Sequence, residues 1–257
     1  MSRLKIAIAL LTGFCASSVV SNAGEDSYRT DYRITLSGIP IASATFVTQL
    51  ASSRYKIRGT FVSAGVADLI TDISAETNVS GRLRNNQMEA SHYSLVYRNG
   101  KKVRTYDVRL DGGNVTQSEI KPPPKKRPKN WIPVTASDLK AVLDPLSSLI
   151  IPDGEKICQR TLAIFDGESR MDLVLSHRGT KEFSSGGKTS KATVCSVRYV
   201  PKSGFRKGRD DVEYLSNVSG MEIWFAKTND LPLYAPVYAR IPTRYGPVYI
   251  TAVKFSG

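Results

Sequence analysis

The sequence predicts a mostly β protein, with a single long antiparallel sheet that curls into an open barrel or spiral around one helix. Roughly ten segments alternate apolar and polar residues, as strands with one buried face do. Turn-forming pairs such as Asn99-Gly100 and Asp166-Gly167 separate these segments. A clear helical pattern occurs near the middle of the chain, between two series of strands. A sheet with so many strands seldom stays flat, so we expect it to curl.

The first series of strands covers the amino-terminal half. Apolar residues alternate with polar ones at 32–36, 42–46, 55–61, 73–83 and 93–97. A two-residue Asn99-Gly100 turn would place Val96 opposite Val103 and Tyr93 opposite Tyr106. The tract 121–129 contains four prolines, which exclude a helix and an interior strand. We expect this tract to be an extended link.

The helical pattern covers residues 133–152, and we expect a helix near 135–150. Apolar residues recur there at steps of three and four: Leu139, Val142, Leu143, Leu146, Leu149 and Ile150. Asp144-Pro145 is typical of a helix start, so we expect two short pieces or one helix kinked near Leu143. The apolar face would pack against the concave side of the sheet.

The second series of strands follows Pro152. We expect strands at 158–164, 170–176, 193–199 and 221–225. A last hairpin would run through 234–243 and 249–255, with its turn at Tyr245-Gly246-Pro247.

The first 23 residues predict a cleaved signal peptide, and residues 24–257 a single curled β domain. Arg3 and Lys5 precede a short apolar run, and Ala23 ends a small-residue cleavage site. Phe14 before Cys15 does not favour lipoprotein processing. Removal of the leader lowers the net charge from +13 to +11, because Arg3 and Lys5 leave with it. No later run is long enough to span a bilayer, so we expect a periplasmic protein that is not integral to the membrane.

Two of the three cysteines, Cys158 and Cys195, follow the predicted leader. In an exported chain they most simply form one disulfide, which stabilises by roughly 4 kcal/mol in the chain-entropy account. Two free thiols or a redox pair are the alternatives, although there is no CxxC spacing. Two cysteines and two distant histidines do not favour zinc, and we expect no metal and no cofactor.

The sequence predicts no catalytic residues. His92 and His177 lie in or beside strands, and neither belongs to a hydrolase or metalloprotease motif. Asp166, Glu168 and Asp172 are close in sequence, but Asp166-Gly167 is better explained as a turn.

A basic tract is the strongest indication of a binding partner, and its cations are Lys121, Lys125, Lys126, Arg127 and Lys129. Export argues against nucleic acid as the partner of this tract. The candidate partners are then anionic lipid head groups, lipopolysaccharide or acidic wall polymers. A solvated linker is the other interpretation. A second basic loop, at Arg206, Lys207 and Arg209, is open to the same two interpretations.

A series of short motifs resembles a family of uncharacterised exported bacterial proteins, domain of unknown function 3108. The motifs are SGIPIA at 37–42, DPLSSL at 144–149, FDG at 165–167, LPLYAPV at 231–237, and Cys195, Arg198, Tyr199, Gly204, Trp224 and Gly246. Ser37 and Ser43 stand where the family tends to have glycine. The resemblance implies a Gram-negative periplasmic protein with a curled β architecture similar to that of periplasmic lipoprotein carriers. It implies no catalytic residues.

Our leading hypothesis is therefore a non-enzymatic periplasmic protein that supports cell-envelope integrity. It would bind an apolar or lipid-like ligand, or an envelope protein partner, in the curled sheet. The first alternative is an interaction scaffold whose core is filled, and the weaker one is a hydrolase acting through His177. A continuous apolar cavity beside the 133–152 segment would favour ligand binding, and a packed interior would favour the scaffold. The strand tyrosines either line such a cavity or pack across strands: Tyr32, Tyr55, Tyr93, Tyr97, Tyr106, Tyr199, Tyr234 and Tyr249.

Overall fold

The structure is a computed structural model, and it describes residues 26–65, 72–229 and 231–255. The predicted signal peptide at 1–23 lies outside these residues. Where the structure describes the chain, no helix is long and apolar enough to cross a membrane.

Nearly all the regular structure is antiparallel β-sheet, as predicted. The first series of strands comprises β1 (Asp26–Leu36), β2 (Ile39–Ala51), β3 (Arg54–Ser63), β4 (Ile73–Arg84), β5 (Gln87–Asn99), β6 (Lys102–Asp111) and β7 (Asn114–Lys121). The second comprises β9 (Ile151–Pro152), β10 (Arg160–Phe165), β11 (Arg170–Ser185), β12 (Lys188–Ser203), β14 (Glu222–Lys227), β15 (Leu233–Ile241) and β16 (Val248–Phe255). β8 (Trp131–Ile132) and β13 (Phe205–Arg206) form a separate two-stranded pair.

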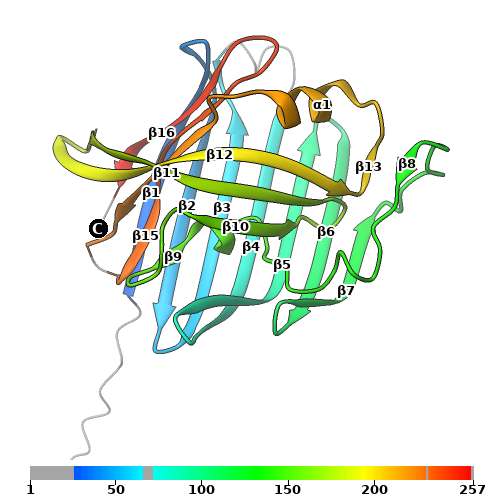
Figure 1. Cartoon of the computed structure of the whole chain (residues 1–257), viewed down its shortest axis with the longest axis horizontal. Coiled ribbons are helices and arrows are strands. Elements are labelled where there is room, and N and C mark those ends of the chain that lie inside the picture. The colour runs from blue at the N-terminus through cyan, green and yellow to red at the C-terminus, as the bar shows by residue number, and fades with distance from the viewer. Residues whose placement is uncertain (1–25, 66–71, 230, 256–257) are drawn as a thin grey trace, which may run out of the picture.

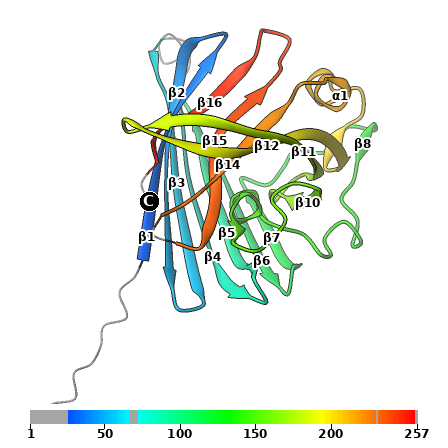
Figure 2. The ribbon, with the colours of Figure 1, turned by 60° about the vertical axis from the view of Figure 1, so that its left-hand side comes forward.

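One sheet contains both series, in the order β10-β11-β12-β14-β15-β16-β1-β2-β3-β4-β5-β6-β7, with β9 paired to β15. The two series meet where β1 pairs with β16. The sheet curls so strongly that β10, β11 and β12 cross over the concave side of the first series (Figure 1). The turned view confirms that these strands form a second layer in front of β3 to β6 (Figure 2).

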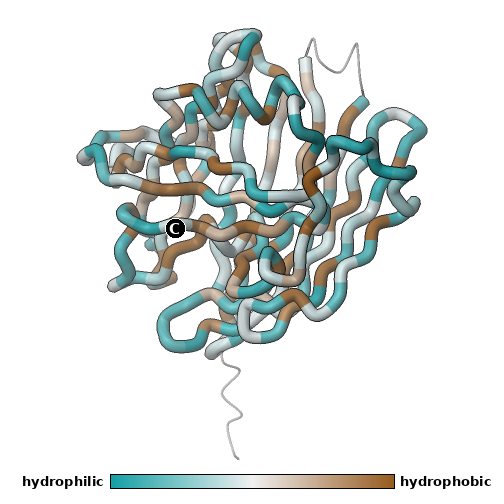
Figure 3. The backbone as a smooth tube through the Cα atoms, turned by 45° about the vertical axis from the view of Figure 1, so that its right-hand side comes forward, coloured by the Kyte–Doolittle hydropathy of each residue, from teal (hydrophilic) through white to brown (hydrophobic). Residues whose placement is uncertain are grey.

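Alternation of side chains places the core on the concave side. In β1, Tyr28, Thr30, Tyr32 and Ile34 are buried and Arg29 is exposed. Apolar and polar residues alternate along the strands in Figure 3. The inward faces bury their apolar area against each other, which is the main driving force for this curled arrangement.

The predicted helix near 135–150 is wrong. The segment consists of turns and one short 3-10 turn at Ser147–Leu149 (η2), and Ala141 has a φ of 52°, which no right-handed helix tolerates. Its backbone makes only short turn bonds within the segment, and the groups of Leu139, Val142 and Leu143 bond to other parts of the sheet. The apolar residues still face inward: Val142 and Ile150 belong to the core, and Leu139 and Leu146 pack against it.

Residues 139–143 link the two edges of the sheet, and we call this stretch the edge clasp. On the β7 side, Val115 N donates to Leu139 O (2.9 Å) and Val142 N donates to Gly113 O (2.7 Å). On the β10 side, Leu143 N donates to Ala163 O (2.7 Å) and Phe165 N donates to Leu143 O (3.0 Å). Without these bonds, backbone amide and carbonyl groups at both edges of the sheet would lack partners. The stretch is therefore extended and not helical.

The turn between β10 and β11 also rests on the other edge. Ser118 Oγ of β7 donates to Gly167 O (3.2 Å). A Cβ at Gly167 would lie 3.2 Å from Tyr106 Cβ, so a side chain there would press against β6. Asp166 forms the predicted turn, since its carboxylate accepts from Glu168 N (2.9 Å) and Ser169 N (2.6 Å).

The β5–β6 hairpin forms where it was predicted but in a different register. Asn99 pairs with Lys102, so the two loop residues are Gly100 and Lys101. Val96 therefore lies opposite Thr105, and Tyr93 lies opposite Val108. A shift of the turn by one residue moves every cross-strand pair along the hairpin.

One helix, α1 (Asp210–Asn217), was not predicted from the sequence. Its first turn carries Asp210, Asp211 and Glu213, which suit the positive end of a helix dipole. Val212 is its one buried residue, which explains why the helix has little apolar periodicity.

The predicted disulfide is present. Cys158, just before β10, is bonded to Cys195 of β12, with 5.7 Å between the Cα atoms. Both cysteines are buried in a cluster that includes Leu162, Leu175 and Phe225. The bridge therefore fixes the chain just after the 133–152 segment to the layer that crosses the concave side.

Replacing both cysteines (Cys158→Ser with Cys195→Ser) should lower the free energy of unfolding by about 2–4 kcal/mol, because the bridge closes a loop with a sequence separation of 37. Urea unfolding under oxidising conditions measures this loss. In a reducing buffer the two proteins should unfold at similar urea concentrations. Equal stability under oxidising conditions would contradict the structural role of the bridge.

Candidate functional site

An apolar cavity of about 350 Å³ lies on the concave side of the sheet, and we call it the inner cavity. Its wall comes from strands on both sides of the β1–β16 junction and from the turn after the edge clasp. The lining includes Tyr28, Thr30, Tyr32, Ile34, Ala44, Phe46, Thr48, Ile57, Phe61, Leu146, Leu149, Ile150, Ile223, Pro236, Tyr238, Ala239 and Ile250. Its size and composition are typical of sites for small apolar ligands.

Alternation in β1 and β2 brings the cavity's polar groups together. Tyr28 pairs with Thr48, and Thr30 pairs with Phe46, so hydroxyls and aromatic rings share one patch of wall. Tyr32 Oη donates to Pro236 O (2.7 Å), and its ring meets Phe46 edge-on at 5.8 Å. The Thr30 hydroxyl is buried and makes no hydrogen bond of normal length within the described residues.

The tyrosine hydroxyls in this wall stay protonated and neutral. Burial raises the pKa of Tyr28 and of Tyr32, and the neighbouring Thr48 and Thr30 hydroxyls offset only part of the rise. The wall therefore offers uncharged hydroxyls and apolar surface. Such a wall suits a molecule that is mainly apolar and carries a few neutral polar groups.

The turn 144–150 forms the inner side of the cavity, and Asp144 fixes its shape. Asp144 is only 1% exposed. Its Oδ1 accepts from Leu146 N and Ser147 N, both at 2.9 Å, and its Oδ2 accepts from Ser147 Oγ. These bonds hold the η2 turn so that Leu146 and Leu149 face the cavity.

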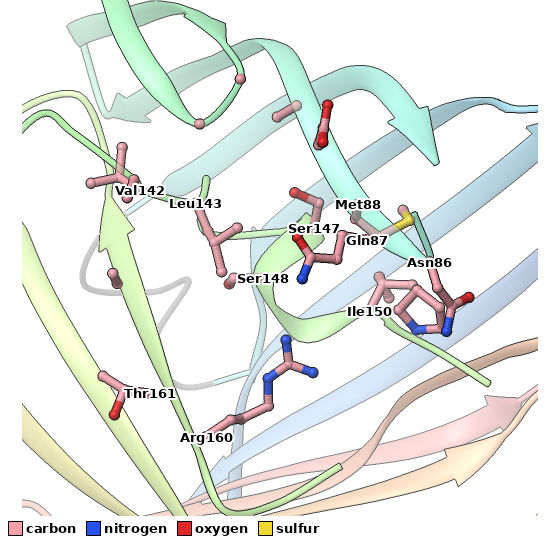
Figure 4. Close-up of a pocket in the computed structure, with 17 residues that line it drawn as sticks. Asn86, Gln87, Met88, Val142, Leu143, Ser147, Ser148, Ile150, Arg160 and Thr161 are labelled. Atoms are coloured by element: carbon pink, nitrogen blue, oxygen red, sulfur yellow. The ribbon is translucent and has the colours of Figure 1, made fainter. Parts of the chain in front are cut away.

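A second cavity of about 390 Å³ lies on the other side of the same turn. It is lined by the clasp, by Asn86 and Gln87 of the β4–β5 hairpin, and by Arg160 of β10. Figure 4 shows Arg160 reaching from β10 toward the 147–150 turn. Ile150 lines both cavities. The second cavity has more polar and charged side chains, so the inner cavity is the better candidate for an apolar ligand.

The sequence identified only part of this wall. Tyr32 is the one tyrosine of the predicted set that lines the inner cavity, where it is joined by Tyr28 and Tyr238. Tyr55 and Tyr93 belong to the packed core instead. Strand alternation in 28–34 could have indicated Tyr28, but the curvature that brings β15 to β1 is a tertiary property.

The candidate catalytic side chains are dispersed. His92 Nε2 lies 2.7 Å from Asp107 Oδ2, and His177 is exposed on β11 opposite Cys195. The Asp166 carboxylate accepts a hydrogen bond from Glu168 N in the β10–β11 turn, and the Glu168 carboxylate pairs with Arg127 (2.6 Å). Asp172 pairs with Arg170 and Lys202. Among the described residues, no group of three or more His, Cys, Asp or Glu side chains is placed to hold a metal ion.

The basic tract divides into structural and free cations. Arg127 stacks on Trp131, 3.9 Å from its ring centre, as well as pairing with Glu168. Lys121 pairs with Glu119 (3.0 Å). Lys125, Lys126 and Lys129 are exposed.

The second basic loop lies beside this tract. Phe205 of β13 pairs with Ile132 of β8, and Arg206 pairs with Trp131. Lys207 N donates to Asn130 O, and Asn130 Nδ2 donates to Lys207 O, both at 2.8 Å. The fold thus joins two basic segments that are far apart in the sequence.

Comparison with known families and structures gives the following matches. The family described as "Protein of unknown function (DUF3108)" matches residues 31–253. Among solved structures, the chain is similar to the crystal structure of a beta-barrel-like protein of domain of unknown function DUF1849 from Brucella abortus. The identity is 12% and the TM-score 0.46, over 90% of this chain and 97% of that one. A comparison with curated proteins gave no match.

Asp144 should give the stability a specific pH dependence. Burial raises the pKa of its carboxyl group, and the bonds from Ser147 and Leu146 offset this only in part. Between the ordinary aspartate pKa and the raised value, the folded state binds more protons than the unfolded state. The contribution of Asp144 to the free energy of unfolding therefore falls as pH rises through that window. Asp144→Asn removes this dependence, so the variant should gain stability relative to the wild type as pH rises from the ordinary aspartate pKa of about 4 through the raised value.

Urea unfolding of both proteins over this range measures the effect. A stability difference that does not vary with pH would contradict it. Asp144→Ala should be less stable than Asp144→Asn by about 3 kcal/mol at any pH, because neither side chain titrates and alanine leaves the Leu146 and Ser147 amides without an acceptor in a buried site.

Proposed function

This chain belongs to the DUF3108 family, and we propose that it is a non-enzymatic periplasmic protein that binds an apolar or lipid-like ligand in its inner cavity. The observation that carries the proposal is the cavity itself, about 350 Å³ in volume and walled almost entirely by apolar side chains. Apolar wall atoms that face such a space lack the dispersion contacts of a packed core, which costs stability. A ligand that fills the space recovers that loss.

The lining also supports a ligand class. Neutral hydroxyls at Tyr28, Thr30 and Thr48 adjoin the apolar wall. An acyl chain with an ester, amide or hydroxyl group fits this combination, whereas a highly charged metabolite would have to lose its hydration without a compensating ion pair. An apolar side chain or acyl group of an envelope protein is the other occupant that we include in the proposal.

The proposed location and role follow from the leader-like first 23 residues and from the disulfide. A signal peptide and a buried disulfide are both typical of exported proteins. A periplasmic carrier of apolar molecules would support cell-envelope integrity, and we propose an anionic envelope surface as the partner of the basic tract. Loss of envelope integrity in a deletion strain, seen as sensitivity to detergents, would support this role.

Ala44→Phe tests the cavity directly. Ala44 is 7% exposed and lines the cavity between Tyr32 of β1 and Phe61 of β3. A benzyl group there should occupy the space and weaken binding of the fluorescent probe N-phenyl-1-naphthylamine about tenfold or more. The melting temperature should stay the same or rise, because the ring fills a void rather than crowding a packed core.

Ser43→Phe is the matched control, since Ser43 precedes Ala44 on β2 and is exposed. It should bind the probe as the wild type does. Mass spectrometry of organic extracts should find a lipid with the purified wild type and less of it with Ala44→Phe. Equal probe binding by the two variants, with no lipid in either extract, would refute the proposal.

A further inference from the structure

One end of the curled sheet differs from the rest of the surface, and we call it the rim. It contains the turns β1–β2, β5–β6 and β15–β16, together with the ends of β3 and β7. The antiparallel registers place these at one end, because Leu36 pairs with Val248 and Ile73 pairs with Asn99. Ser37 N also donates to Pro247 O (2.9 Å), which joins two of the turns directly.

Exposed apolar side chains gather at the rim. Five large hydrophobic residues are strongly exposed among those that the structure describes: Ile39 (55%), Val62 (48%), Val103 (45%), Tyr245 (86%) and Val253 (41%). The first four lie on rim turns or at rim ends of strands, and only Val253 lies toward the opposite end. Single exposed hydrophobic residues are ordinary, but four of the five at one end form a concentration that is not.

Free cations surround one side of the same rim. They are Lys101 and Lys102 of the β5–β6 hairpin, Lys125, Lys126 and Lys129 of the basic tract, and Arg206 and Lys207 beside β13. None of the seven forms an ion pair with another described residue. The β8–β13 pair projects past the edge of the sheet next to β6 and β7 (Figures 1 and 2).

Several acidic side chains near the rim form ion pairs, whereas Asp72 beside the β5–β6 hairpin and Glu213 of α1 form none among the described residues. Glu76 pairs with Arg98, Asp210 pairs with Arg244, and Asp211 pairs with Arg209. The seven free cations therefore outnumber these two acids, and the β6–β8 side keeps an excess of positive charge.

We propose that the rim docks onto the surface of an anionic lipid bilayer, with the cations on the lipid phosphates and Ile39, Val62, Val103 and Tyr245 in the headgroup region. Proteins that lie on membranes combine these two features, because each apolar side chain adds burial and each cation adds attraction to anionic lipid. A nucleic acid or an acidic polymer would use the cations but would gain nothing from the exposed aliphatic residues. This extends the proposed anionic partner from the basic tract to the whole rim, and it does not depend on a ligand in the inner cavity.

The inner cavity reaches the same end. Ile34, Phe61 and Ile250 line it, and each lies two residues from the rim end of its strand. A docked rim would thus bring the inner cavity next to the lipid that we propose as its ligand.

Vesicle binding tests the docking. The wild type should bind vesicles of phosphatidylglycerol and phosphatidylethanolamine, bind phosphatidylcholine vesicles much more weakly, and lose affinity as salt is added. A triple variant, Lys125→Gln, Lys126→Gln and Lys129→Gln, should bind the anionic vesicles on the order of 100-fold more weakly, at about fivefold per cation. The matched control is Lys156→Gln, Lys188→Gln and Lys191→Gln, which removes the same charge from exposed lysines away from the rim.

Equal vesicle affinity of the two triple variants would overturn the proposal. So would tight binding of a soluble oligonucleotide or acidic polysaccharide with no binding of anionic vesicles.

The orientation has its own test. Tyr245→Trp places a fluorophore on the rim, and Val253→Trp places one toward the opposite end. Because Trp131 and Trp224 also fluoresce, each variant is compared with the wild type. Vesicles with brominated acyl chains should quench Tyr245→Trp more than the wild type and add no quenching in Val253→Trp, and equal added quenching would overturn the orientation. Ala44→Phe, with its cavity filled, should still bind vesicles as the wild type does. Loss of vesicle binding in that variant would show that a cavity ligand holds the protein on the membrane, which would overturn docking through the rim.

Discussion

A curled sheet whose ends do not meet leaves two rows of backbone groups without partners, and the rest of this fold depends on how those rows are satisfied. β7 and β10 are the two edges. Their strands do not pair with each other, and residues 139–143 lie between them and bond to both. Buried amide and carbonyl groups without partners would each cost on the order of 1–3 kcal/mol. The clasp avoids that cost without completing the barrel.

The clasp also explains why a cavity exists. A fully paired barrel would have to pack its interior with strand side chains alone. Here the chain enters the interior after Leu143, and Asp144 holds it in a turn that divides the space in two. Leu146, Leu149 and Ile150 fill part of the concave side and leave the apolar space beside β1 and β2 open. The same segment thus satisfies the edges of the sheet and leaves room for the inner cavity.

Much of the sheet could be predicted because strand alternation and turn chemistry are local. Tyr32 and Ile34 face inward as their spacing indicates, and Asp166 forms a turn because its side chain bonds two nearby amides. The prediction of a helix at 139–150 failed because apolar residues at steps of three and four indicate only which side chains are buried. This spacing does not indicate which carbonyl groups accept hydrogen bonds from the amides of Val142 and Leu143. Those acceptors are Gly113 in the β6–β7 turn and Ala163 in β10, which precede and follow the segment in sequence, and no local pattern predicts them. The residues of the cavity wall could be predicted only in part for the same reason, since β15 is connected to β1 in the sheet only through β16.

The pairing of β1 with β16 has a consequence for how the molecule is made. Each series of strands is built largely from neighbours in sequence, but the seam between them joins the first strand to the last. Contacts with so large a sequence separation form late, because the whole intervening chain must be ordered or looped out first. During synthesis, β1 keeps an open edge until the residues of β16 have emerged. The topology therefore delays completion of the fold until the entire sheet is available.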